Sequence, residues 1–232
     1  MAIESTTTER WTLTTGGRTT NLHLARPTQA AVGGVLLLHP WWGVNDDIRA
    51  YADRLAAEGF TVATPDLFEG RVATTIEDAD RLSTELDEDV ADAFVLAAED
   101  ELGRTLGDPS LGIATVGFSM GAAWALWLPA QRQEVAATVV YYGSMEGPSL
   151  SRARVPVLGH FAEKDEFEPE ESIAAFEATL RSAGRDAEIH RYLGTGHWFA
   201  EPTQPAYVPA AADLAWNRTV RFLRRHLLDG AH

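Results

Sequence analysis

Gly117-Phe118-Ser119-Met120-Gly121 forms the pattern G-x-S-x-G at the junction of two different hydrophobic patterns. A short apolar run, residues 111–116, precedes it and predicts a buried strand, whereas residues 120–128 predict a helix. A serine on such a sharp strand-to-helix turn presents its hydroxyl above the sheet, and the two glycines allow neighbouring backbone to approach closely. The pattern predicts that Ser119 is a nucleophile. The alternative is a glycine-rich helix start that Ser119 merely caps.

A serine hydroxyl is a weak nucleophile, so this hypothesis requires a base and an acid elsewhere in the chain. Where this motif opens a helix after a strand, the acid and then the histidine follow the serine along the chain. One loop after a predicted strand contains Glu163, Asp165 and Glu166, and a later loop contains His197. The residues alone leave the choice of carboxylate open, and a packed loop histidine is the alternative for His197. The order of the residues favours a Ser–His–acid triad.

Apolar strands alternate with amphipathic helices around these residues. Residues 11–14 and 19–24 alternate in polarity around Gly16-Gly17, which predicts an N-terminal β-hairpin. Further strands are predicted at residues 32–38, 60–63, 111–116, 137–142, 155–161 and 186–192. Helices are predicted from an N-cap at Asn45 to Gly59, over 75–106 as one or two surface helices, and at 120–128, 169–184 and 210–228. The alternation predicts an α/β fold, with a mostly parallel sheet, helices on both faces and reactive groups at the carboxyl ends of the strands.

Length and composition limit the classes of protein that fit. The 232 residues predict one domain, 1–232, and the excess of 34 Asp and Glu over 19 Lys and Arg argues against nucleic-acid or membrane partners. The chain has no cysteine, and its seven histidines lack metal-ligand spacing, so we expect no metal and no cofactor. Residues 1–11 lack the apolar segment of a signal peptide, and no apolar run approaches the roughly 20 residues of a membrane span, so the expected location is cytoplasmic. Monomer and dimer remain equally open.

Five motifs, in register over nearly the whole chain, resemble those of the dienelactone hydrolase family. They are His39-Pro40-Trp41-Trp42-Gly43-Val44-Asn45, Pro65-Asp66-Leu67, the G-x-S-x-G motif, Asp165-Glu166-Phe167 and Gly196-His197-Trp198-Phe199-Ala200. The resemblance implies an α/β-hydrolase fold with little or no lid and the hydrolysis of small esters or lactones. It implies a triad of Ser119, His197 and, from its position in the motif, Asp165. It also places two oxyanion donors on the backbone N–H groups of Trp41 and Met120, as the general rule for this fold expects.

Three positions depart from the pattern that the resemblance implies. The family's best-known members use cysteine where this chain has Ser119, and they carry a glutamate in the stretch that here reads Pro40-Trp41. These two changes agree with each other, because a serine hydroxyl needs no resting partner beyond the histidine. The same members carry an arginine for the substrate carboxylate where this chain has Glu201. We therefore expect a neutral substrate, unless Arg71 or Arg81 supplies the missing cation.

The remaining candidate residues would line a substrate pocket. They are Trp42, Phe118, Tyr142, Trp198 and Glu201; for the aromatic residues, packing at the base of a loop is the alternative. The leading hypothesis is a serine hydrolase that cleaves a small, neutral ester or lactone through an acyl-enzyme, with this small molecule as its partner. A thioesterase, an acyltransferase or a small peptidase would use the same triad. A non-catalytic binding protein on the same fold is the alternative from a different class.

Overall fold

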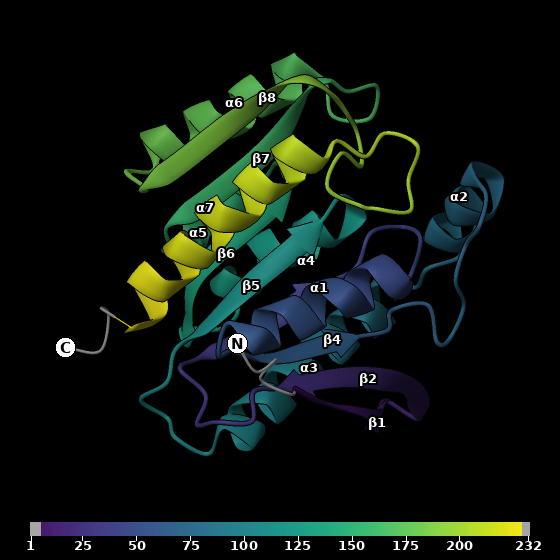
Figure 1. Cartoon of the computed structure of the whole chain (residues 1–232), viewed down its shortest axis with the longest axis vertical. Coiled ribbons are helices and arrows are strands. Elements are labelled where there is room, and N and C mark those ends of the chain that lie inside the picture. Colours follow the sequence, from purple (N-terminus) through teal and green to yellow (C-terminus); the bar gives the residue numbers. More distant parts are fainter. Residues whose placement is uncertain (1–5, 229–232) are drawn as a thin grey trace.

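An eight-stranded sheet runs through the centre of the computed structural model, which describes residues 6–228 (Figure 1). The strands are β1 (Thr7–Thr15), β2 (Arg18–Arg26), β3 (Gly34–Leu38), β4 (Thr61–Pro65), β5 (Ile113–Phe118), β6 (Val135–Tyr141), β7 (Val157–Lys164) and β8 (Ala187–Gly196). Their spatial order is β1-β2-β4-β3-β5-β6-β7-β8. β2 pairs antiparallel with β1 and β4, and the other neighbouring pairs are parallel. The predicted mostly parallel sheet is confirmed.

The predicted N-terminal hairpin is formed by β1 and β2. The register pairs Thr15 with Arg18, so Gly16 and Gly17 are the two residues of the turn. Their φ angles are +56° and +78°. Two-residue turns with positive φ at both positions match the twist of the strands that they join, which explains why two glycines stand there.

Helices cover both faces of the sheet, as predicted. They are α1 (Asp46–Ala57), α2 (Ile76–Thr84), α3 (Glu88–Leu106), α4 (Met120–Trp127), α5 (Pro148–Arg152), α6 (Glu170–Ser182) and α7 (Pro209–Leu228), with a 3-10 turn η1 (Leu128–Ala130). α1 and α7 lie on one face, and α3, α4 and α6 pack on the other (Figure 1). Because both faces are covered, every residue of β3, β4 and β5 is buried. Among residues 6–228, no helix is long and apolar enough to span a bilayer.

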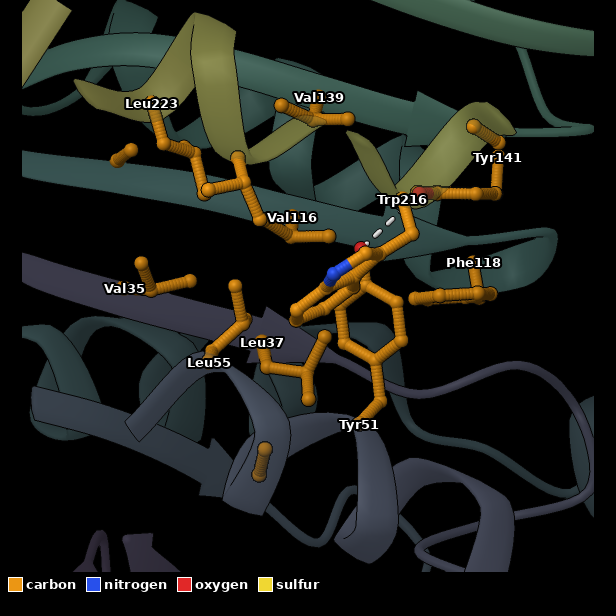
Figure 2. Close-up of a cluster of buried hydrophobic side chains, with 14 of the residues drawn as sticks. Val35, Leu37, Tyr51, Leu55, Val116, Phe118, Val139, Tyr141, Trp216 and Leu223 are labelled. Atoms are coloured by element: carbon orange, nitrogen blue, oxygen red, sulfur yellow. Dashed lines mark hydrogen bonds between the residues drawn. The ribbon is translucent and has the colours of Figure 1, made fainter. Parts of the chain in front are cut away.

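Figure 2 shows the apolar core on the face that α1 and α7 cover. Leu37 of β3 and Val116 of β5 lie there in one cluster with Tyr51 of α1 and Trp216 of α7. The Tyr51 and Trp216 rings meet edge to face, with centroids 5.1 Å apart. The hydroxyl of Tyr51 lies 3.0 Å from that of Tyr141, so the buried polar tip of the ring has a partner. This core fixes β5, the strand that leads to the predicted nucleophile.

The acidic segment over residues 75–106 forms two helices with separate caps. The side chains of Thr75 and Asp87 accept hydrogen bonds from the N–H groups that begin α2 and α3. The prediction of one or two surface helices is confirmed, with two helices formed; α3 is the longer one and packs one of its faces against the sheet. Its buried stripe consists of Ala91, Phe94, Val95, Ala98, Glu99 and Leu102. The stripe has helical spacing, and its acidic neighbours occupy the solvent face.

Candidate active site

Ser119 occupies the sharp turn between β5 and α4, with φ +47° and ψ −115°. Residues other than glycine seldom adopt a positive φ, and such strained positions concentrate at functional sites. The turn needs its two glycines: a Cβ on Gly117 would lie 2.5 Å from the carbonyl oxygen of Gly121, and one on Gly121 would lie 2.6 Å from that of His39. The N–H of Ser119 donates to the carbonyl of Tyr141 at 2.8 Å. This hydrogen bond joins the turn to the end of β6, and the close approach of Gly121 to the carbonyl groups of Leu38 and His39 packs the start of α4 against the end of β3.

The structure brings Ser119, His197 and Asp165 together from three different strand ends. Ser119 Oγ is 2.9 Å from His197 Nε2, and His197 Nδ1 is 2.8 Å and 2.7 Å from the two carboxylate oxygens of Asp165. The side chains of His197 and Asp165 are only 5% and 1% exposed, so solvent hardly reaches the contact between them. This geometry suits proton transfer from the serine to Nε2 while the carboxylate holds the proton on Nδ1.

Of the three candidate carboxylates, Asp165 is the one that contacts the imidazole. Its Oδ1 also accepts two backbone N–H groups of its own loop, at 2.9 Å and 3.0 Å. Glu163 instead accepts a hydrogen bond from the N–H of Gly194 at 2.8 Å, and Glu166 is exposed. The loop backbone thus orients the Asp165 carboxylate toward the histidine.

The N–H groups of Trp41 and Met120 belong to the two segments that meet at the serine turn. Met120 is the first residue of α4, so its N–H has no acceptor within the helix. Trp41 follows Pro40, whose carbonyl accepts hydrogen bonds from Gly43 N–H at 3.0 Å and from His39 Nδ1 at 2.6 Å. Because the C=O and N–H of a trans peptide point in opposite directions, these two bonds set the direction of the Trp41 N–H.

His39 is a buried residue that sequence reasoning did not single out. Its Nε2 accepts the N–H of Leu67 at 3.0 Å, so Nδ1 carries the proton and donates to Pro40. Burial lowers the pKa of His39 and so favours the neutral ring, whereas the Asp66 carboxylate acts in the opposite direction. His39 therefore joins the turn after β3 to the turn after β4. The sequence offered one signal for this role, because His39 is the first residue of the motif over residues 39–45.

Aromatic side chains stand beside the histidine. Trp41 stacks on Trp198 with ring centroids 6.1 Å apart, and meets Phe167 edge to face at 5.4 Å. Phe167 also lies 5.0 Å from the ring of His197 and is 48% exposed. Sequence reasoning missed Phe167 as a site residue, although it ends one of the family motifs. Trp41, Phe167 and Trp198, here called the aromatic rim, form an apolar border to the site. Trp42 is buried against Trp41 and Trp198, so the prediction that it lines a pocket is wrong.

Tyr142 and Glu201 are buried beside His197 and do not line an open pocket. Tyr142 packs 4.8 Å from the imidazole ring and donates its hydroxyl to Glu201 Oε1 at 2.7 Å. Burial raises the pKa of Glu201 to about 8, opposed by the Tyr142 hydrogen bond and reinforced by Asp47. Glu201 therefore holds a proton at neutral pH. The expectation that it meets the substrate as an exposed charge is wrong.

The prediction that Phe118 lines a pocket is also wrong. Phe118 is 1% exposed and stacks on Tyr141 with centroids 4.4 Å apart. Figure 2 shows its ring in the core near Tyr51. As the last residue of a strand with both faces covered, it contributes to the core and not to the surface of the site.

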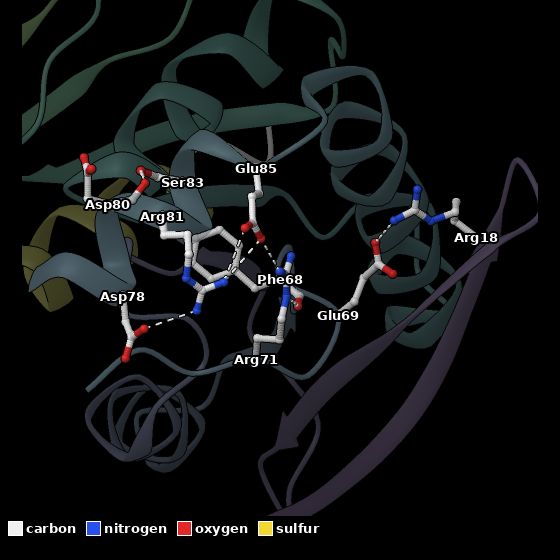
Figure 3. A network of polar contacts seen from close by, with 9 residues as sticks. All are labelled: Arg18, Phe68, Glu69, Arg71, Asp78, Asp80, Arg81, Ser83 and Glu85. Atoms are coloured by element: carbon white, nitrogen blue, oxygen red, sulfur yellow. Dashed lines mark hydrogen bonds and ion pairs between the residues drawn. The ribbon is translucent and has the colours of Figure 1, made fainter. Parts of the chain in front are cut away.

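Charged side chains near the site bind one another (Figure 3). Arg71 Nη1 lies 2.8 Å from Glu85 Oε2, and Arg81 reaches the same glutamate at 3.4 Å and Asp78 at 3.2 Å. Both arginines that could have replaced the missing cation are thus neutralised by carboxylates. Within the described chain, no group of three or more His, Cys, Asp or Glu side chains could hold a metal ion.

A mostly parallel sheet with a strained serine turn after its fifth strand defines the α/β-hydrolase class. The model of the dienelactone hydrolase family matches residues 21–227, and the chain belongs to this family. Protein usf of Aquifex pyrophilus is 30% identical over 204 residues, which cover 84% of this chain and 88% of that protein. A Bradyrhizobium protein named probable 2-oxo-3-(5-oxofuran-2-ylidene)propanoate lactonase is 28% identical over 98% of each chain.

A crystal structure of a dienelactone hydrolase-like promiscuous phosphotriesterase from metagenomic libraries has the same fold. It superposes with a TM-score of 0.85, covering 95% of this chain and 98% of the other, at 19% identity. These comparisons confirm the family and the α/β-hydrolase fold that the five sequence motifs predicted.

Proposed function

We propose that the chain hydrolyses small, neutral carboxylic esters or lactones with Ser119 as the nucleophile. The observation that carries the proposal is the continuous line of hydrogen bonds from Ser119 through His197 to Asp165, at a turn with strained backbone. Membership of a hydrolase family supports the same reaction class. The name of the Bradyrhizobium relative adds a lactone to the substrates worth testing.

In the proposed reaction, Ser119 Oγ attacks the ester carbonyl while His197 Nε2 takes the hydroxyl proton. Asp165 holds the imidazole in place and stabilises its protonated form. The N–H groups of Trp41 and Met120 donate to the oxyanion of the tetrahedral intermediate. His197 then gives the proton to the leaving alcohol oxygen as the C–O bond breaks, which leaves an acyl-enzyme. Water, deprotonated by His197, releases the carboxylate product and restores the serine.

The surroundings of the triad support a neutral, partly apolar substrate. The aromatic rim offers ring faces and edges to an acyl or alcohol group. Arg71 and Arg81 are already paired with carboxylates, so a substrate carboxylate gains little from either.

Replacement of the serine tests the proposal. We expect Ser119→Ala to fold normally and to lower kcat for p-nitrophenyl acetate by about 10⁴–10⁶, the loss seen when a triad is disabled as a unit. A fluorophosphonate probe should label the wild type and not the variant. Retention of a tenth of the activity would show that Ser119 is not the nucleophile, and the absence of wild-type labelling and turnover would favour a binding protein.

Two variants in the loop that contains Asp165 can be compared in the same assay. Asp165→Asn should lower kcat by about 10⁴, because the amide favours the wrong imidazole tautomer. Glu163→Gln changes a carboxylate two residues away that binds the backbone N–H of Gly194, so its activity should stay within a few-fold of wild type. Equal losses in the two variants would mean that Asp165 is not the acid of the triad.

A further inference from the structure

A second pocket lies outside the active site, between α1 and the β1-β2-β4 side of the sheet. Arg10, His23 and Thr64 line it from three adjacent strands, and Arg49 lines it from α1. The sheet register places Arg10, His23 and Thr64 in one row across the three strands, because Arg10 pairs with His23 and His23 pairs with Thr64. Asn21 also lines the pocket, so five side chains that carry hydrogen-bond donors border it.

Two polar atoms of this row are buried without a partner among the described residues. They are Nε2 of His23 and Oγ1 of Thr64. Thr64 is 0% exposed, so solvent does not satisfy its hydroxyl. Buried polar groups in folded proteins nearly always have a hydrogen-bond partner. Both atoms belong to residues that line the same pocket, so one ligand in it would supply both partners.

The arginines leave donor capacity toward the pocket. Within residues 6–228, Arg10 forms no salt bridge, and Arg49 uses Nη1 to bind Asp46 at 2.8 Å. The carboxylate of Asp66, which also lines the pocket, is already occupied: Oδ1 accepts the N–H of Phe68 and Oδ2 that of Gly70. The pocket therefore has unused donors and a carboxylate whose two oxygens are each hydrogen-bonded.

We propose that this pocket binds a small oxyanion, either a carboxylate or a phosphate group. The guanidinium groups of Arg10 and Arg49 supply charge-assisted hydrogen bonds, and the Thr64 hydroxyl and His23 Nε2–H supply neutral ones. Burial lowers the pKa of His23; nearby Asp53 opposes this shift, and Arg49 and Arg10 add to it. A bound anion offsets the two arginines, so it should raise that pKa.

The His23 ring provides a direct readout of occupancy. In the full chain, sodium phosphate or sodium acetate is titrated at ionic strength held constant with sodium chloride, and the ring resonances of His23 are followed by NMR. We expect a saturable shift and a higher His23 pKa with at least one of the anions. The tighter of the two identifies a phosphate or a carboxylate as the preferred group. A change that is linear in concentration, or equal to that in chloride alone, overturns the proposal.

Arginine variants assign the binding to this pocket. Arg10→Gln and Arg49→Gln should each weaken binding by about tenfold or more, because each removes charge-assisted hydrogen bonds. Arg104→Gln is the matched control, since Arg104 pairs with Glu101 on α3 at the same i,i+3 spacing as Arg49 with Asp46 on α1. Equal affinity in all three variants would place the anion elsewhere and overturn the proposal.

Discussion

At the scale of single residues, His39 determines the direction of a peptide group. Its Nδ1 donates to the carbonyl of Pro40, and the N–H on the other side of that peptide belongs to Trp41. His39 is thus a positioning residue for one of the two proposed oxyanion donors. It reaches the reaction only through the backbone.

Replacing His39 should therefore affect turnover more than binding. We expect His39→Phe, which removes both hydrogen bonds, to lower kcat by about 10–100-fold with little change in KM, somewhat less than the loss of an oxyanion donor. His39→Asn keeps a donor near the Nδ1 position and should recover part of kcat. Steady-state kinetics on a neutral ester measures both. Equal losses in the two variants, with KM raised in parallel, would indicate a general structural role.

Glu201 makes the folded chain less stable as the pH rises, whereas most carboxyl groups in folded proteins have the opposite effect. Its pKa is raised from 4.5 to about 8 by burial, so the folded chain keeps a proton that the unfolded chain releases. Below the pKa that Glu201 has in the unfolded chain, the residue does not lower the free energy of unfolding, because it is protonated in both the folded and the unfolded state. Between the two values the free energy of unfolding falls by about 1.4 kcal/mol for each pH unit.

Glu201→Gln should remove this loss while keeping an acceptor for the Tyr142 hydroxyl. Relative to wild type, the variant should gain stability steadily from about pH 5 to pH 8, by up to about 4 kcal/mol. Urea denaturation of both proteins across that range measures the difference. A constant difference, independent of pH, would mean that Glu201 is ionised in the folded protein throughout.

At the scale of elements, the contact between α4 and β3 depends on Gly121. A Cβ there would overlap the carbonyl oxygens of Leu38 and His39, so α4 would have to move away from the strand end. We expect Gly121→Ala to lower the free energy of unfolding by about 2–3 kcal/mol, as overpacking does, and to lower kcat because Met120 moves with the helix. Denaturation and kinetics on the same samples separate the two effects.

Gly103→Ala is the matched control for that substitution. Gly103 is also a helical glycine, in α3, but a Cβ added there would meet nothing within 4 Å. Alanine should stabilise α3 by about 0.5–1 kcal/mol through helix propensity and leave kcat unchanged. If both variants changed stability in the same direction, the close contact at Gly121 would not be the cause.

Elements with a strong local signal could be predicted from the sequence. The turn at Gly16-Gly17 and the cap at Asn45, which accepts the N–H of Ile48, depend on neighbouring residues. The five-residue α5 and the extension of β8 to Gly196 were missed. The latter depends on pairing with Lys164 across an irregular register, which no local pattern encodes.

The candidate site also has features that the sequence predicts and one that it does not. The types and order of Ser119, Asp165 and His197 follow from motifs at strand ends. The burial of Glu201 does not, because it depends on Tyr142, 59 residues away in the chain. A carboxyl group that looks exposed in a loop motif becomes a buried, protonated partner of a tyrosine only through tertiary packing.

At the scale of the whole molecule, the formal net charge of −15 acts on any charged substrate. Glu201 is buried and protonated, and Arg71 and Arg81 are paired with carboxylates. We therefore expect this long-range field, and not a local contact, to disfavour an anionic ester. Fields of this kind act through the approach of the substrate and are screened over about 10 Å at 0.1 M salt. A local like-charge contact in a desolvated site would be screened much less.

The salt dependence of the substrate preference therefore distinguishes a long-range field from a local like-charge contact. At low ionic strength, kcat/KM for a neutral ester should exceed that for its carboxylated analogue, and the ratio should fall several-fold as sodium chloride rises from about 10 mM to about 500 mM. Glu201→Gln should leave this ratio unchanged at pH 7, because the wild-type residue already carries a proton. A ratio that ignores salt and drops in the glutamine variant would restore Glu201 as the source of repulsion. A preference for the carboxylated ester at every salt concentration would require a cation that contacts the substrate directly.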